Sequence, residues 1–405
     1  MNSSITKVKL NDTSSPCPVC MSSDISIFAD ISQVPVHCNL LYPTRADALN
    51  SPIADMRLGF CRICGHIFNV EFDPDYTKYI QDYENSLHFS PRFQQYAETL
   101  AADLVNRYRL HEKTILEIGC GRGDFLRLLC ELGHNRGIGF DPSHAPDWDP
   151  NTANHQITFI RDFYSERYAG YKADLICCRH VLEHIQFPRD FISSVRRAID
   201  DKVHSVVFFE VPNVMFTLKD LGIWDLIYEH CAYFSISSLA HLFETCGFKV
   251  LRITEAFGGQ FLCIETVPSK SQSDVDYPLF QKNTPEQMEG YVKEFAEKRH
   301  ITVKKWQRGI KRLRKEGKKV VIWGVGSKGV TFLNTLKKES HIEYGVDLSI
   351  YKQGKYVAGT GQKIMPPDFL KKYKPDVVIV MNPIYIKEIQ DVIEKMELSS
   401  NVITV

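Results

Sequence analysis

The chain has 405 residues, which is too long for a single core at roughly 100–200 residues per domain, so two or three domains are expected. Its 49 Lys and Arg residues balance 49 Asp and Glu residues, which argues against a general nucleic-acid binder with a strongly basic face. No apolar run approaches the roughly 18 residues of a membrane span, and the N-terminus lacks the apolar core of a secretion signal. We therefore expect a cytoplasmic protein that binds neither nucleic acid nor membranes.

Residues 1–75 are expected to form a small metal module, because they carry two CxxC pairs, Cys17–Cys20 and Cys61–Cys64. Each pair can present two thiolates from a tight turn, and four thiolates complete the tetrahedral shell of a structural zinc ion. A thioredoxin-like redox centre would need one CxxC beside a βαβ unit, which this segment lacks. The alternative is two coincidental pairs of core cysteines. We expect zinc at Cys17, Cys20, Cys61 and Cys64.

Residues 76–268 are expected to form the second domain. A helix is expected from about Ser90-Pro91, and from Thr114 onward short apolar runs alternate with amphipathic helices. The runs TILEI, GIGF, DLICC, VVFFEV and FLCIETV are typical of buried strands. This alternation predicts a parallel α/β sheet.

The first of these strands runs directly into a glycine-rich turn at Gly119, Gly121 and Gly123, and a helix follows. Glycines let the backbone approach a ligand closely. This turn alone could serve a dinucleotide. The acidic Glu117 within the strand and the continuation GDFLRLL make the segment resemble motif I of class I S-adenosylmethionine methyltransferases.

Three later pieces follow in the order that this resemblance requires. The next strand ends in Asp141, whose carboxylate can accept both hydroxyls of a ribose. Asp162 and Phe163 resemble the segment that borders adenine in these methyltransferases, and ADLICCRHVLEHI resembles their fourth strand and its loop. Each piece alone could be an ordinary strand end. Together they predict S-adenosylmethionine as cofactor, held by Glu117, the three glycines, Asp141, Asp162 and Phe163.

A segment that interrupts the alternation of predicted strands and helices contains Tyr228, Glu229 and His230 in succession. This combination is typical of acid–base chemistry, since His titrates near neutral pH and a flanking carboxylate can orient it. The alternative is a structural histidine.

Residues 269–318 are expected to be a linker and a helical segment, whose many bases favour a solvated helix face over a nucleic-acid patch. A second α/β unit occupies residues 319–405 and opens with a strand, the turn Gly324-Val-Gly-Ser-Lys-Gly329 and a helix. With Asp347 further on, this turn fits the dinucleotide fingerprint. A glycine-rich helix start equally accepts the diphosphate of a sugar nucleotide, which we favour over NAD. Whether the loop binds a ligand stays open.

The whole chain resembles the three-part sugar-nucleotide C-methyltransferases of deoxysugar pathways. The resemblance rests on the four cysteines, the S-adenosylmethionine motifs and the C-terminal segments GVGSKG, VDLSIYKQGKYVAGTGQKI and VVIVMNPIY. The resemblance implies a class I methyltransferase Rossmann-like domain flanked by an N-terminal zinc module and a C-terminal Rossmann-like domain. His184 corresponds to an active-site histidine of that family. Where many members have Tyr-His-Glu-His, this chain has Ile227-Tyr228-Glu229-His230.

The expected reaction is methyl transfer to a carbon beside the carbonyl of a nucleotide-linked keto-deoxysugar. Such a C–H bond needs a base and a group that holds the enolate oxygen. We expect His230 as the base, oriented by Glu229, with His184, Tyr228 or Tyr83 as hydrogen-bond donors. An O- or N-methyltransferase, or a methyltransferase-like binding protein without catalysis, is the alternative. The sugar, the nucleotide, the methylated carbon and the oligomeric state stay open.

Overall fold

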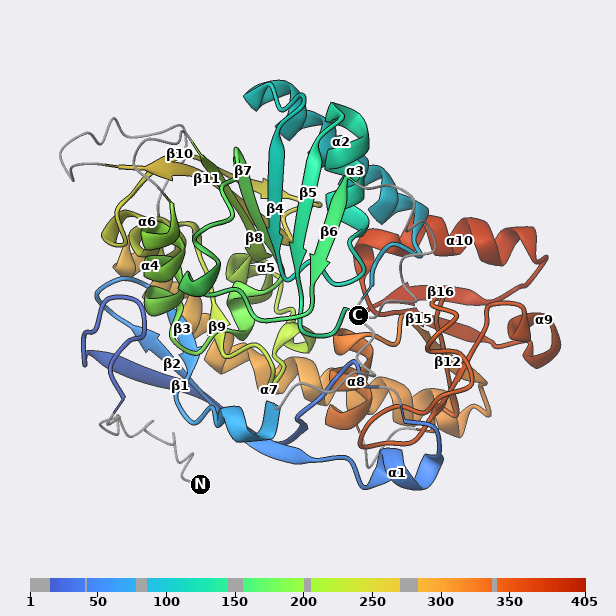
Figure 1. Ribbon diagram of the computed structural model, residues 1–405. Coiled ribbons are helices and arrows are strands. Elements are labelled where there is room, and N and C mark those ends of the chain that lie inside the picture. Colours follow the sequence, from blue (N-terminus) through green and yellow to red (C-terminus); the bar gives the residue numbers. More distant parts are fainter. Residues whose placement is uncertain are drawn as a thin grey trace.

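The computed structural model describes residues 15–40, 42–77, 86–144, 156–199, 205–269, 283–336 and 341–405. The strands of these residues form a four-stranded N-terminal sheet, a seven-stranded central sheet and a five-stranded C-terminal sheet (Figure 1). The α/β class predicted from the sequence is confirmed. Within the described part of the chain, no helix is both long and apolar enough to cross a membrane.

The N-terminal sheet contains a strand from far along the chain. Its order is β1 (Ile25–Pro35), β2 (Ile53–Cys61), β3 (Ile67–Asn69) and β9 (Ala232–Tyr233), all antiparallel. Short helices α1 (Arg45–Leu49) and η1 (Pro74–Thr77) follow β1 and β3. Because β9 begins two residues after His230, the sheet that carries the cysteines also fixes the predicted catalytic segment.

The central sheet has the order β10-β11-β8-β7-β4-β5-β6. Its strands are β4 (Thr114–Ile118), β5 (Arg136–Phe140), β6 (Ile157–Ile160), β7 (Leu175–Arg179), β8 (Val206–Pro212), β10 (Phe248–Ala256) and β11 (Phe261–Pro268). Five strands, β4 to β8, are parallel, whereas β11 is antiparallel to β8 and β10 is antiparallel to β11. The expectation of a parallel sheet is therefore wrong for this edge. The four residues between β10 and β11 can only join antiparallel neighbours, and Gly258 and Gly259 there have φ of 65° and 85°.

Helices cover both faces of the central sheet (Figure 1). One face packs on α2 (Pro91–Tyr108) and α3 (Asp124–Gly133), and the other on α4 (Pro188–Ala198) and α6 (Ile236–Thr245). Successive residues of β4 alternate between the two cores, Ile115 with α2 and α3 and Leu116 with α4 and α6. As expected, α2 begins beside Ser90, whose hydroxyl accepts a hydrogen bond from the backbone N–H of Phe93 at 3.3 Å.

The C-terminal sheet is parallel, with the order β14-β13-β12-β15-β16. The strands are β12 (Val320–Trp323), β13 (Tyr344–Val346), β14 (Lys363–Met365), β15 (Val377–Val380) and β16 (Asn401–Thr404). The accompanying helices are α8 (Ser327–Thr335), α9 (Phe369–Tyr373) and α10 (Ile386–Lys395). A 31-residue helix, α7 (Pro285–Lys315), precedes this unit and buries Met288, Val292 and Phe295 in one core with residues of the N-terminal and C-terminal units.

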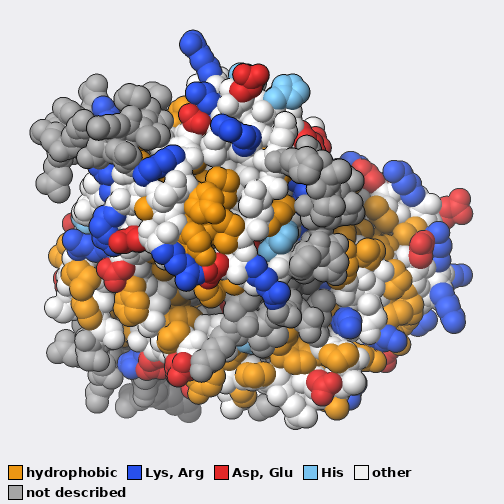
Figure 2. Space-filling model, in the orientation of Figure 1, with side chains coloured by type: hydrophobic (Ala, Val, Ile, Leu, Met, Phe, Trp, Pro, Cys, Tyr) orange, Lys and Arg blue, Asp and Glu red, His pale blue; other side chains and the backbone are white. Residues whose placement is uncertain are grey.

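Both parallel arrangements place a switch in strand order beside a glycine loop. In the central sheet β4 lies between β5 and β7, and in the C-terminal sheet β12 lies between β13 and β15. Open α/β sheets bind ligands at the carboxyl ends of strands at such points. Over the face shown in Figure 2, Lys and Arg side chains are scattered among Asp and Glu, in keeping with the zero net charge of the chain.

Candidate active site

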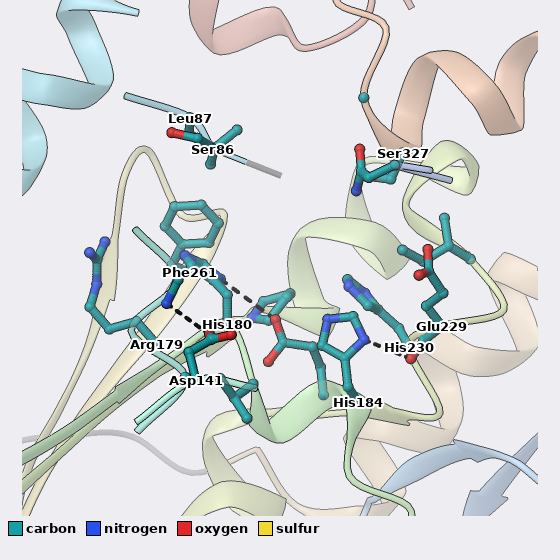
Figure 3. A pocket seen from close by; sticks show the side chains of 18 of the residues that line it. Ser86, Leu87, Asp141, Arg179, His180, His184, Glu229, His230, Phe261 and Ser327 are labelled. Atoms are coloured by element: carbon teal, nitrogen blue, oxygen red, sulfur yellow. Dashed lines mark hydrogen bonds and ion pairs between the residues drawn. The ribbon is translucent and has the colours of Figure 1, made fainter. Parts of the chain in front are cut away.

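A cavity of about 910 Å³ joins the two glycine loops. Its lining includes Gly119, Gly121 and Asp141 at one end, and Gly326 and Ser327 at the other. His180, His184, Glu229 and His230 also line it, and the close view shows how several of these side chains converge (Figure 3). One cavity therefore connects both switch points of the fold.

The three glycines of the first loop differ in what surrounds them. All three have positive φ, at 70°, 52° and 80° for Gly119, Gly121 and Gly123. A Cβ added to Gly119 would lie 2.2 Å from Val181, and one added to Gly123 would lie 2.5 Å from Phe159, so these two positions are closed by packing. At Gly121 no atom of the residues that the structure describes lies within 4 Å of an added Cβ. Gly121 is thus the position where the backbone is open to a ligand.

Asp141 lies directly beside this loop. One carboxylate oxygen accepts the backbone N–H of Gly121 at 2.8 Å, and the other accepts the N–H of Ser143 at 2.8 Å and its hydroxyl at 2.5 Å. A carboxylate has about four lone-pair sites, so capacity for further donors remains. Both the position and the remaining acceptor capacity fit a ligand with hydroxyl groups.

Glu117 lies on β4 beneath the loop and lines the cavity. Burial raises its pKa to about 8, so the side chain holds a proton at neutral pH. Its Oε2 has no hydrogen-bond partner among the described residues. A buried polar atom without a partner beside an open loop fits a ligand-contacting role.

Asp162 and Phe163 both line the cavity, at the carboxyl end of β6. The Phe163 side chain is 63% exposed, which is unusual for a large apolar ring. Asp162 accepts the backbone N–H of Phe163 at 2.8 Å and the hydroxyl of Tyr168 at 2.5 Å, which fixes the turn.

A buried charged network that sequence reasoning missed lies at the ends of β7 and β8. The carboxylate of Glu210 accepts a hydrogen bond from Arg179 at 3.0 Å and another from the hydroxyl of Tyr96. His180 Nε2 lies 2.7 Å from Glu210 Oε1, and its Nδ1 lies 3.6 Å from Glu183 Oε1. Burial alone would lower the pKa of His180, but the two carboxylates outweigh it and raise that pKa to about 9. The cavity therefore contains an imidazolium at neutral pH.

The backbone of His180 also carries a signal of function. Its φ is 55°, in the left-handed region that few residues other than Gly adopt, although Asn, Asp and His do so more often than most. Its position directly after a buried strand, in the sequence CCRH, was the available clue.

Glu229 does not orient His230, contrary to the expectation. Its Oε2 accepts the backbone N–H of Cys38 at 2.8 Å, and its Oε1 lies 3.3 Å from Nδ1 of His37. Both partners belong to the cysteine-containing module, 191 and 192 residues earlier in the chain. The carboxylate of Glu229 is therefore held by the module, whose sheet also pairs with β9 three residues further along the chain.

His184 and His230 lie against each other in the middle of the cavity, with ring centroids 4.8 Å apart at 83°. Nδ1 of His184 lies 2.9 Å from the backbone carbonyl oxygen of Glu229. Because a carbonyl only accepts, Nδ1 carries a proton, so the neutral form of this ring has its lone pair at Nε2. Burial and the positive charges around His230 hold its pKa well below the usual value, so that ring is neutral at neutral pH. The donor atoms of Glu183, His184 and His230 lie within 4.8 Å of one another, so this group could hold a metal ion.

The structure separates Tyr228 from the other predicted catalytic residues. Its side chain is 1% exposed, does not line the cavity, and contacts Phe72 and Tyr76. The hydroxyl accepts the backbone N–H of Asp73 at 3.0 Å. Tyr228 therefore does not offer a hydrogen bond to a ligand in this cavity. Tyr83, the other predicted donor, lies outside the described residues.

The C-terminal glycine loop forms the other end of the cavity. Asp347 accepts the backbone N–H groups of Val325 at 2.8 Å and Ser349 at 2.9 Å, as Asp141 does in the first loop. Lys328 is ion-paired with Asp225, so its charge is already compensated. The ammonium of Lys352 is buried and lies 3.4 Å from the carbonyl oxygen of Val325.

The four predicted cysteine ligands are together. The Sγ atoms of Cys17 and Cys64 are 3.6 Å apart, those of Cys20 and Cys61 are 3.5 Å apart, and all four lie within 4.8 Å of one another. A tetrahedral zinc ion with Zn–S bonds of about 2.3 Å separates its sulfurs by about 3.8 Å, so this cluster fits such an ion.

Comparisons with known proteins follow this division of the chain. Residues 93–253 match the family described as methyltransferase domain, and residues 278–402 match the family described as C-methyltransferase C-terminal domain. The C-methyltransferase NovU of Streptomyces niveus is 24% identical over 397 residues, which cover 93% of this chain and 91% of NovU.

Solved structures are also similar to part of the chain. Magnesium protoporphyrin IX methyltransferase (ChlM) of Synechocystis PCC 6803 matches with 18% identity and a TM-score of 0.36, over 46% of this chain and 90% of that one. The pyocyanin biosynthetic protein PhzM matches with 13% identity and a TM-score of 0.35, over 44% of this chain and about half (55%) of that one.

Proposed function

We propose that this chain, which belongs to the S-adenosylmethionine-dependent methyltransferases and carries a C-methyltransferase C-terminal domain, methylates a carbon beside the carbonyl of a nucleotide-linked keto-deoxysugar. The observation that carries this proposal is the single cavity between two glycine loops, with histidines in its middle. A small methyl acceptor alone would not need the second loop. NovU is itself a C-methyltransferase, which supports carbon as the acceptor.

S-adenosylmethionine, when bound, supplies a methyl group on a positively charged sulfur. Glu117, Gly121, Asp141, Asp162 and Phe163 are the residues that we expect to hold it, because they line one end of the cavity. The open space at Gly121 admits a ligand to the backbone, and Asp141 offers acceptors for ribose hydroxyls. The exposed ring of Phe163 offers a face for the adenine. Gly119 and Gly123 act on the loop conformation, since packing closes both positions.

A structural zinc ion is proposed for the four-cysteine cluster. Cys17, Cys20, Cys61 and Cys64 would hold it, and the ion would join the turn before β1 to the turn between β2 and β3. Four thiolates fill the coordination shell, which suits a structural ion and leaves no position for a substrate.

His230 is the proposed base. A neutral imidazole accepts a proton, and burial beside the positive groups around it keeps His230 neutral. The imidazolium of His180 lines the same cavity, and its charge would favour the negative oxygen that forms when the proton leaves. It would act through its electric field and not as a hydrogen-bond donor, because both ring nitrogens face carboxylates. The side chain of Glu229 contacts the module, so we do not propose that it orients His230. Its backbone carbonyl oxygen instead holds the ring of His184.

His184 is the second candidate for the base. Its Nδ1–H is anchored on the carbonyl of Glu229, so the neutral ring directs a lone pair from Nε2, the arrangement that a base requires. A neutral His184 in this arrangement cannot donate a hydrogen bond to an enolate from Nε2. The donor role expected for His184 therefore requires the protonated ring.

The test is deuterium exchange at the carbon beside the carbonyl, measured with purified protein and a set of NDP-4-keto-6-deoxysugars in D2O. Methyl transfer is measured in parallel as a gain of 14 mass units. If His230 is the base, His230→Ala abolishes both exchange and transfer, whereas His184→Asn retains exchange at a lower rate. Exchange at the wild-type rate in His230→Ala, together with its loss in His184→Asn, would transfer the role to His184. A product methylated on oxygen or nitrogen, without carbon exchange, would replace the C-methylation proposal.

A further inference from the structure

We propose that Glu183, His184 and His230 form an open metal site in the middle of the cavity, at which a divalent transition-metal ion such as Zn²⁺ binds reversibly and stops methyl transfer. This site is separate from the four-cysteine cluster and takes an ion of its own. Binding of the ion requires only these three side chains. The inhibition rests on the proposed function, in which His230 removes the proton.

The three side chains supply the ligand set of an open metal site. One donor atom from each of Glu183, His184 and His230 lies within 4.8 Å of the other two. Two histidines and one glutamate bind Zn²⁺ in sites whose fourth position stays open to water or substrate. Bonds of about 2.1 Å in tetrahedral geometry separate two donors by about 3.4 Å, so each donor atom has to move by less than about 1 Å to close on one ion.

Glu183 is an independent indication of a ligand. It is 2% exposed, it lines the cavity, and its Oε2 has no hydrogen-bond partner among the residues that the structure describes. The other oxygen, Oε1, lies 3.6 Å from Nδ1 of His180, which is long for a charge-assisted hydrogen bond. A buried carboxylate oxygen without a donor is costly, and coordination to a cation would satisfy it.

The backbone already orients His184 as a metal ligand. Its Nδ1 donates a hydrogen bond to the carbonyl oxygen of Glu229 at 2.9 Å, which leaves Nε2 for an ion. Histidines that bind metals almost always donate their other ring N–H in this way, and the bond fixes the direction of the ring. The ring of His230 lies beside that of His184, so the two imidazoles can share one ion (Figure 3).

Two contacts hold together the segments that carry the ligands. Glu183 and His184 belong to the short helix η4 (Leu182–His184), whereas His230 comes shortly before β9. The carbonyl oxygen of Glu183 accepts a hydrogen bond from the Sγ–H of Cys231 at 3.6 Å, and the carbonyl oxygen before His230 accepts the bond from His184. Because both neighbours of His230 are attached to η4, the three donors are assembled before an ion arrives, which lowers the entropic cost of binding.

The charges nearby favour reversible binding over permanent occupancy. Glu183 supplies the one negative charge of the ligand set. The positive side chains of Lys328 and His180 line the same cavity, where they are paired with Asp225 and Glu210. Pairing reduces their repulsion of a divalent cation without removing it. The cysteine cluster, with four thiolates, should therefore keep its zinc under conditions in which this site loses its ion.

A metal ion at this site would occupy the proposed base. A neutral imidazole has a single nitrogen lone pair, and the coordinate bond to the ion uses the lone pair of His230 that would otherwise accept the substrate proton. Metal binding and proton removal therefore exclude each other. The chain would be inactive until the ion dissociates.

The first experiment is a titration of the zinc-loaded full chain with Co²⁺, followed by absorption. Co²⁺ on nitrogen and oxygen ligands gives visible d–d bands, whereas Co²⁺ on cysteines adds a thiolate charge-transfer band in the near ultraviolet. We expect the visible bands alone, with the zinc content unchanged. Glu183→Gln, His184→Asn and His230→Ala should each raise the Kd about tenfold or more, because even an outer-shell partner of a ligand contributes about 10–100-fold to metal affinity. The matched controls His111→Ala and Glu131→Gln, at exposed positions outside the cavity, should leave the Kd unchanged.

The second experiment measures methyl transfer with added Zn²⁺. The ion should inhibit the reaction, and citrate, a weak chelator, should restore the rate while the cysteine cluster retains its zinc. In Glu183→Gln, which keeps the shape of the side chain without its charge, each rate is compared with the metal-free rate of the same variant. The Zn²⁺ concentration that halves the rate should rise about tenfold or more in this variant.

Affinity for S-adenosylhomocysteine and the zinc content verify that each variant is folded. The proposal is overturned if no Co²⁺ binds to the zinc-loaded chain, if the thiolate band appears, or if the Kd is unchanged in the folded variants. If Co²⁺ binds as expected but no keto-sugar is methylated, the metal site stands and the proposed function fails. If a carbon is methylated and added Zn²⁺ does not lower the rate, the inhibition fails alone.

Discussion

The charged state of His180 has a measurable consequence for stability. Its pKa is about 9 in the folded chain, against 6.5 for an ordinary histidine, because the carboxylates of Glu210 and Glu183 outweigh the effect of burial. A folded-state pKa above the unfolded value means that the folded state binds the proton more tightly. The resulting stability is fully present below pH 6.5 and is lost as the pH rises through 9. At 1.36 kcal/mol per pH unit, the difference amounts to about 3 kcal/mol.

The assay is urea unfolding of wild type and His180→Asn at several pH values from 6 to 9.5. Asn tolerates the positive φ of this position and carries no titrating group. The difference in unfolding free energy between the two proteins should shrink by about 3 kcal/mol across this range. Burial also raises the pKa of Glu117 to about 8, but this group is common to both proteins and cancels in the difference. His111→Asn, at an exposed position, is the control. A difference that stays constant from pH 6 to 9.5 would refute the assignment of an imidazolium to His180.

Three further predictions concern the cofactor, the metal and the module. Gly121→Val should raise the Kd for S-adenosylhomocysteine at least tenfold in calorimetry, because its side chain would enter the open space at the loop and because a β-branched residue is strained at the φ of 52°. Unchanged affinity in a folded variant would show that another loop holds the cofactor. Elemental analysis should find about one zinc per chain. Cys61→Ser should lower both the zinc content and the rate of methyl transfer, since β9 pairs with the sheet that the cysteines fix. A second bound metal would indicate that the Glu183–His184–His230 group also binds one. Tyr228→Phe should lower the free energy of unfolding by about 1 kcal/mol, because the hydrogen bond from the backbone N–H of Asp73 is lost. Hydrogen exchange of the substrate should continue in this variant. Loss of that exchange in a folded variant would show that Tyr228 takes part in the reaction.

The features predicted correctly from the sequence are those that neighbouring residues determine. A buried strand, a glycine turn and a helix form a local unit, so the loop at Gly121 and its partner Asp141 follow from their order in the chain. The cysteine pairs were predictable for the same reason, since each CxxC is a tight turn and a metal shell needs two of them. The hairpin of β10 and β11 was not predicted, because its apolar runs have the same pattern as parallel strands.

The partners of the predicted catalytic residues could not be derived from the sequence, because they depend on long-range pairing. Three residues adjacent in sequence have side chains in three different places. Tyr228 bonds to Asp73, Glu229 bonds to the module, and His230 lines the cavity. A sequence pattern gives adjacency, whereas the direction of each side chain depends on how β9 pairs with β3. His37 carried no motif that could indicate a role, since its partner lies 192 residues later.

The contacts of Glu229 explain why the module and the methyltransferase domain belong to one chain. Its side chain bonds to Cys38 and His37 of the module, and its carbonyl oxygen lies 2.9 Å from Nδ1 of His184 in the cavity. The pairing of β9 with β3 adds a second connection, two residues beyond His230. A metal ion bound by four cysteines outside the cavity can therefore influence the two histidines at its centre through backbone geometry, without contacting the substrate.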